Sequence, residues 1–232
     1  MSTVDVPRKT TTPPLVAGQR LDRATFHERY EAMPPATRAE LIGGIVHMPS
    51  PLSRDHADEN VPPVVWLDYY AEHTPGVRGG INASIFLGDY GEPQPDCALR
   101  ILPECGGRTR HAGEFIAEAP ELIVEIAKSS RRIDLGPKKA DYESAGCPEY
   151  LVVAIDPHLV HWFVLRDGRF APLAPGPDGI YRSQVFPGLW LDADALFAGD
   201  RPRLRRVVDR GIATPEHAEF VAMLAEVRTR PD

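Results

Sequence analysis

The sequence predicts an α/β (α+β) fold in which a mixed central β-sheet is flanked by helices. Residues 121–127 form a nearly continuous apolar run, interrupted by Glu125, which is typical of a strand covered on both faces. A helix and a second buried strand, at residues 150–155, follow along the chain. The two-residue turns Gly43-Gly44 and Asp167-Gly168 each predict a β-hairpin. These patterns favour a sheet packed between helices.

The N-terminal segments lead into this sheet. Residues 1–20 have too little apolar content to repay ordering, so we expect a disordered tail there. A short helix is expected at residues 25–33, because its apolar side chains fall at helical spacing. Residues 39–42 and 45–48 supply the two strands of the first hairpin.

A helix and two further strands come next. Ser53 is expected to cap a helix that runs toward residue 74, and the Pro62-Pro63 pair should kink or interrupt it. Strands are expected at residues 82–87 and 96–102, and turn-forming residues fill the stretch between them.

The segment between the two buried strands is expected to be a helix. Asp134 should cap this helix, with Pro137 in its first turn and Gly146 at its end. Beyond the second buried strand, residues 160–165 and 170–173 form the second hairpin.

The C-terminal part is expected to add a helix to the main domain. A short segment at residues 185–197 closes a domain that spans residues 21–198. Residues 199–232 are expected to form a basic linker and then a helix, which Thr214 caps. The apolar stripe of that helix consists of Phe220, Leu224 and Val227.

The composition favours a soluble protein of the reducing cytoplasm. Its three cysteines form no CxxC pair and are odd in number, which indicates neither a disulfide framework nor a cysteine zinc site. No apolar run reaches the length of a membrane span, and the N-terminal residues lack the apolar core of a signal peptide. The net charge of −7 argues against a cation-coated surface for gripping DNA. The basic run at residues 128–139 favours, on composition alone, a solvated helix face.

Glu125 carries the most information about function. A carboxylate inside an apolar strand is costly to bury unless a cation or hydrogen-bond donors compensate it, so either a structural salt bridge or a functional site is expected. Asp96 opens another strand, and neighbouring strands lie ~4.8 Å apart, so the two carboxylates could meet. Paired carboxylates repel unless a divalent cation or a shared proton joins them, and a hard cation such as Mg²⁺ prefers oxygen ligands.

Three stretches carry a family resemblance: ELIGGIVHMPSP at residues 40–51, QPD at 94–96 and PELIVEIAKSSRRIDLGPKKADYESAGCPEYLVVAIDP at 120–157. Together they resemble the Uma-two family of restriction endonucleases, part of the PD-(D/E)xK nuclease superfamily. The resemblance implies a restriction-endonuclease-like fold and a metal-dependent site for phosphodiester hydrolysis. It also implies roles for four residues: Asp96 and Glu125 as ligands of Mg²⁺ or Mn²⁺, Lys138 as the positive catalytic group, and Glu40 as an additional acidic member.

The sequence also departs from the superfamily pattern. A lysine normally stands two residues after the glutamate, and here that position is Ala127. The resemblance implies that the lysine is displaced to the following helix, as Lys138. Lys128 lies an odd step beyond Glu125, so on an extended strand its side chain would point to the opposite face. Glu40, before a Gly-Gly turn, could instead be an exposed hairpin residue.

The sequence therefore predicts a Mg²⁺- or Mn²⁺-dependent endonuclease that acts on nucleic acid, with DNA favoured over RNA. The alternative is a nuclease fold that no longer cuts and serves as a binding or regulatory module, which the acidic charge balance favours. Glycoside hydrolysis is disfavoured, because none of the three tryptophans lies near the two carboxylates in sequence. We expect a homodimer, since cleavage of both strands needs two symmetric sites and the C-terminal stripe could lie exposed; it could equally pack on its own domain.

Overall fold

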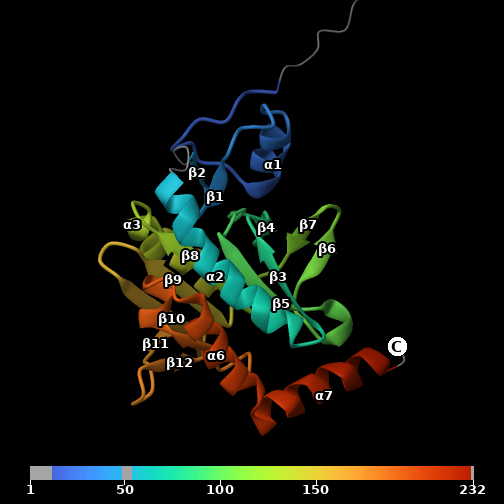
Figure 1. Ribbon diagram of the computed structural model, residues 1–232. Helices are drawn as coiled ribbons and strands as arrows, with labels where there is room; N and C mark the ends of the chain where they lie inside the picture. The colour runs from blue at the N-terminus through green and yellow to red at the C-terminus, as the bar shows by residue number, and fades with distance from the viewer. Residues whose placement is uncertain (1–11, 49–53, 231–232) are drawn as a thin grey trace, which may run out of the picture.

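A six-stranded mixed sheet forms the centre of the computed structural model, which describes the backbone of residues 12–48 and 54–230 and the side chains of residues 12–48 and 61–230. The strand order is β11-β10-β9-β8-β5-β3 (Figure 1). β8 and β9 are parallel, and every other neighbouring pair is antiparallel, which confirms the predicted fold class. The strands are β3 (Val77–Ile81), β5 (Cys97–Ile101), β8 (Leu122–Ala127), β9 (Glu149–Ala154), β10 (Leu159–Arg166) and β11 (Arg169–Leu173).

The two faces of the sheet belong to different core clusters. Alternate residues of β8 enter opposite clusters, so that Val124 belongs to the larger one and Ile123 to the smaller one. Helices α2 (Arg54–Glu72) and α6 (Arg201–Ile212) cover the larger cluster (Figure 1). Glu125 shares the face of Ile123, and both faces of β8 are buried as the apolar run predicted.

A helical crossover joins the parallel strands β8 and β9, as parallel pairing requires. It consists of α3 (Arg131–Ile133), the π-helical turn η2 (Asp134–Lys138) and α4 (Lys139–Ser144). The expected start at Asp134 is wrong, because the helix begins at Arg131 and Asp134 lies buried inside it. Pro137 lacks an N–H and would crowd the carbonyl four residues earlier in an α-helix, which accounts for the wider π turn. Gly146, with φ of +71°, ends the helix as predicted.

Helix α2 continues through Pro62 and Pro63, so of the predicted kink or interruption the interruption does not occur. Two prolines remove helical hydrogen bonds, so packing of the second half of α2 must offset the loss. Trp66 and Tyr70 are buried there, and their polar atoms donate to the carbonyls of Trp190 and Pro187. The expected cap Ser53 lies outside the described residues. No helix in the described part of the chain is long and apolar enough to cross a membrane.

An N-terminal layer of α1 (Arg23–Glu31), β1 (Glu40–Ile42) and β2 (Ile45–His47) packs at one end of the sheet (Figure 1). The described part of the expected tail joins this layer, because Leu15 is buried and Gly18 donates its N–H to the carbonyl of Val46. The hairpin across Gly43-Gly44 forms as predicted. Leu41 exchanges two backbone hydrogen bonds with Glu92, which fixes the hairpin beside the segment that leads into β5.

The strand expected at residues 82–87 is wrong in its bounds. The sheet strand β3 ends at Ile81, and Asn82 follows with a φ of +50° that breaks the extended chain. Beyond it, β4 (Ile85–Phe86) belongs to a separate sheet of order β4-β7-β6. The sequence analysis did not predict two of its strands, β6 (Arg110–Ala112) and β7 (Phe115–Ala117), or the turn η1 (Pro103–Cys105).

The C-terminal part also differs from expectation. The segment that was expected to be a basic linker is instead helix α6. Asp200 caps this helix, and Leu204 and Val208 are buried in it. The elements before and after it are β12 (Ile180–Arg182), β13 (Trp190–Asp192), α5 (Ala193–Phe197) and α7 (Pro215–Thr229). Thr214 caps α7 as predicted. Phe220 of α7 packs edge-on against Phe186, so the apolar stripe lies on its own chain and gives no support for a dimer.

Candidate active site

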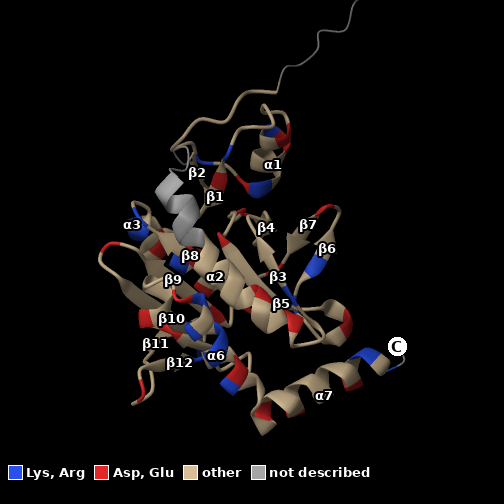
Figure 2. Cartoon of the chain, viewed as in Figure 1, with Lys and Arg blue, Asp and Glu red and all other residues tan. Residues whose placement is uncertain are grey.

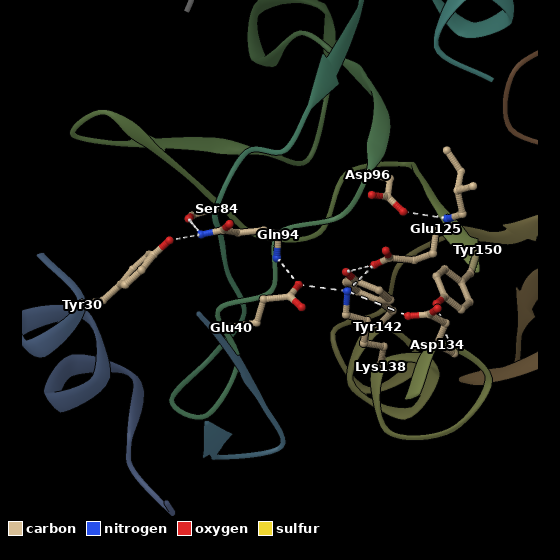
Figure 3. Close-up of polar contacts among 11 residues, drawn as sticks. Tyr30, Glu40, Ser84, Gln94, Asp96, Glu125, Asp134, Lys138, Tyr142 and Tyr150 are labelled. Carbon is tan, nitrogen blue, oxygen red and sulfur yellow. Dashed lines mark hydrogen bonds and ion pairs between the residues drawn. The ribbon is translucent and has the colours of Figure 1, made fainter. Parts of the chain in front are cut away.

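The candidate site lies where β5 begins and β8 ends. In the antiparallel register of these strands Cys97 lies opposite Val124, so Asp96 comes next to Glu125. The Oδ2 atom of Asp96 accepts a hydrogen bond from the backbone N–H of Ile126 at 2.7 Å, which fixes this carboxylate against β8 (Figure 3). The structure thus brings together the two predicted acidic residues of the sheet.

Glu125 is 2% exposed, and its Oε1 atom accepts two hydrogen bonds. The donors are the Nζ of Lys138 and the hydroxyl of Tyr142, each at 3.0 Å (Figure 3). Burial raises the pKa of Glu125 strongly; the Lys138 charge opposes this rise and the Asp96 charge adds to it. The positive group that the buried carboxylate required is therefore Lys138.

Lys138 lies at the centre of a cluster of carboxylates. Its Nζ is 2.9 Å from Oε1 of Glu40, 3.0 Å from Oε1 of Glu125 and 4.0 Å from Oδ1 of Asp134. Burial alone would lower the pKa of Lys138, but these carboxylates raise it, so the ammonium stays charged at neutral pH. Lys138 ends the π turn rather than lying in the first turn of the helix. Lys128, in contrast, is exposed.

Glu40 comes from the N-terminal hairpin, and its side chain points into the cluster rather than to solvent (Figure 3). Its side chain is 12% exposed. Oε1 accepts a second hydrogen bond, from the backbone N–H of Gln94, at 2.7 Å. The Gln94 side chain donates in turn to the oxygens of Tyr30 and Ser84. Glu40 therefore connects the hairpin, the segment before β5 and Lys138.

The sequence analysis did not assign two residues, Tyr142 and Asp134, to the site. Tyr142 donates to Glu125, and buried Asp134 has an Oδ2 atom without a hydrogen-bond partner among the described residues. Burial raises the pKa of Asp134 to about 6. The signal that could have found them is spacing, because Asp134, Lys138 and Tyr142 follow each other at intervals of four, which place side chains on one helix face.

The chemistry of the two sheet carboxylates fits a hard divalent cation. No group of three or more His, Cys, Asp or Glu side chains suited to a metal ion occurs in the described part of the chain. Mg²⁺, however, is usually bound through one or two carboxylates, with waters and substrate phosphates as the other ligands. Asp96 and Glu125 supply that number of carboxylates from adjacent strands.

Comparison with known proteins identifies the family of this chain. A crystal structure of a putative nuclease belonging to DUF820, from Anabaena variabilis ATCC 29413, matches with a TM-score of 0.50 and 15% sequence identity, over 74% of this chain and 96% of that chain. That likeness shows a shared fold. No curated protein matches the chain. The model of the Uma2 family, described as a putative restriction endonuclease, matches residues 24–194. The match includes all four predicted site residues and most of the sequence, so the chain belongs to the Uma2 family.

Proposed function

We propose that the protein is a metal-dependent endonuclease that hydrolyses phosphodiester bonds in DNA. The observation that carries this proposal is the Lys138 ammonium, held between Glu125 and Glu40 beside Asp96. A charged lysine can stabilise the charge that develops on a phosphate, and two carboxylates on adjacent strands can hold a divalent cation that activates water. Membership of a family described as restriction endonucleases supports the same reaction.

Each residue of the site has a distinct role in the proposed reaction. Asp96 and Glu125 would hold Mg²⁺ or Mn²⁺, which when bound lowers the pKa of a water and neutralises charge on a phosphate. Lys138 holds a phosphate oxygen or orients the attacking water through its ammonium. Because this ammonium stays charged, Lys138 acts as an electrostatic clamp rather than as a base. Glu40 and Tyr142 are positioning residues, since one holds Lys138 and the other holds Glu125.

A nuclease fold that binds without cutting is the second candidate function. The net charge of −7 favours it, because nonspecific grip on a DNA backbone comes from cations. Figure 2 shows basic residues in separate groups, at α3 and along α6, rather than over one whole face. The intact cluster around Lys138 favours cleavage instead. A homodimer stays a prediction that rests on the need for two symmetric sites.

Metal titration by calorimetry, followed by a cleavage assay, separates these candidates. The wild type should bind Mg²⁺ or Mn²⁺ and cut DNA more readily than RNA, and Glu125→Gln should lose both properties. Glu149→Gln is a matched control, because Glu149 is also a buried glutamate of the central sheet and lies outside the cluster. Equal metal binding by wild type and Glu125→Gln would contradict the site. DNA binding by the wild type without metal-dependent cleavage would support the binding module.

A further inference from the structure

Two arginines face each other across neighbouring strands of the central sheet. Arg78 of β3 lies directly opposite Arg100 of β5 in the antiparallel register. Like charges in directly opposite positions destabilise a sheet. Burial and the Arg78 charge both lower the pKa of Arg100, while Glu104 and Glu121 act in the other direction. In the part of the chain that the structure describes, neither guanidinium has a hydrogen bond or ion pair.

The arginine pair lies on the same face of the sheet as the candidate active site. Along β5 the side chains alternate, so that Leu99 enters the larger core cluster and Arg100 points to the opposite face, which Glu125 shares. Between the pair and the carboxylates lie Ala98 and Gly80, which are paired in register. A Cβ added at Gly80 would meet no atom within 4 Å, and a small pocket lies there, which Ile85 and Ile116 also line. The arginine pair therefore lies beyond Ala98 from Asp96 on one face of β5.

The spacing along β5 matches a stretch of nucleic acid. Asp96 and Arg100 are four residues apart, which at about 3.3 Å per strand residue gives roughly 13 Å. Successive phosphates of one strand lie roughly 6–7 Å apart through space, because the helix rotates as well as rises by about 3.4 Å per nucleotide, so this separation spans about two nucleotides.

We propose that Arg78 and Arg100 together hold one backbone phosphate of the nucleic acid strand, about two nucleotides from the bond that is cut. The inference rests on the proposed function. An arginine fork binds phosphate oxygens in bidentate fashion, and a phosphate between two guanidinium groups removes the repulsion between them. The ligand compensates a like-charge pair that has no hydrogen bond or ion pair among the described residues.

Binding in the absence of metal tests the pair separately from cleavage. The wild type and the double variant Arg78→Gln/Arg100→Gln are titrated into a fluorescent DNA duplex in EDTA over a range of salt concentrations. Loss of one phosphate contact should make the slope of log K against log salt shallower by about 0.9. The control Arg201→Gln/Arg206→Gln removes two exposed charges from α6 and should keep the wild-type slope. Circular dichroism and melting establish that each variant folds.

A second measurement locates the phosphate. On a duplex with a mapped cut, an uncharged methylphosphonate about two nucleotides from the cut should weaken wild-type binding but not binding by the double variant. Equal salt slopes for wild type and double variant, with DNA bound by both, would overturn the arginine site and leave the proposed function standing. A wild type that neither binds nor cuts nucleic acid would overturn both.

Discussion

Replacing Lys138 with methionine tests whether its charge holds the cluster together. The change keeps a long side chain but removes the ammonium that lies 2.9 Å from Glu40 and 3.0 Å from Glu125. One ion pair at 3 Å contributes about 5 kcal/mol at an effective dielectric constant of 20. Burying the lysine offsets part of that gain, and buried pairs that lose one partner typically cost about 3–5 kcal/mol. A chain of this size loses roughly 2–4 °C per kcal/mol, so the melting temperature should fall by roughly 6–20 °C.

The loss of stability in Lys138→Met should also depend on pH. In Lys138→Met the buried carboxylates have folded-state pKa values above their unfolded values, so the folded state binds protons that the unfolded state releases. The stability of the variant should therefore fall as pH rises. The difference in free energy of unfolding between wild type and variant should be larger at about pH 8 than at about pH 5. Urea unfolding at the two pH values measures it, with Lys139→Met as the adjacent control, because Lys139 lies over the ring of Phe163 outside the cluster. Equal stability of the two variants at the higher pH would refute the electrostatic role.

Three further perturbations have defined outcomes. Glu40→Ala leaves the N–H of Gln94 without its acceptor, so it should cost about 1–3 kcal/mol in urea unfolding and lower the rate of cleavage. Gly211→Ala should cost at least about 1–3 kcal/mol by calorimetry, because a Cβ there would lie 2.1 Å from the carbonyl oxygen of Gly188. Burial raises the pKa of Glu149 from its ordinary 4.5 to about 7, so stability should fall between these pH values, by on the order of 3 kcal/mol, and Glu149→Gln should flatten that part of the pH profile.

The sequence was informative where a charged residue lies within an apolar segment. Glu125 interrupts an apolar strand, and the cost of burying it predicts a positive partner before any partner is known. The structure supplies Lys138 from the helix that follows. The sequence also predicted that Asp96, at the start of a strand, could meet Glu125 if their strands were neighbours, and β5 and β8 pair in the sheet.

The sequence was misleading where structure depends on distant packing. Strand β3 reads VRGGI, which has no apolar alternation, and it is a strand because it pairs with β5. Helix α6 reads as a basic linker because arginines surround its buried residues, although Leu204, Val207 and Val208 have helical spacing. Asp134 was expected to cap a helix since it precedes Pro137, but the helix begins at Arg131 and Asp134 is buried within it.

Three carboxylates hold the site together through backbone N–H groups of other segments. Asp96 accepts from Ile126, Glu40 accepts from Gln94, and Asp141 of α4 accepts from Gly43 in the hairpin turn. Backbone donors leave no mark in a sequence, which is why these connections could not be predicted. Each carboxylate therefore has a structural role as well as a charge, and its replacement by alanine removes both at once. Substitution by asparagine or glutamine keeps an acceptor, so the difference between amide and alanine variants measures the part due to charge.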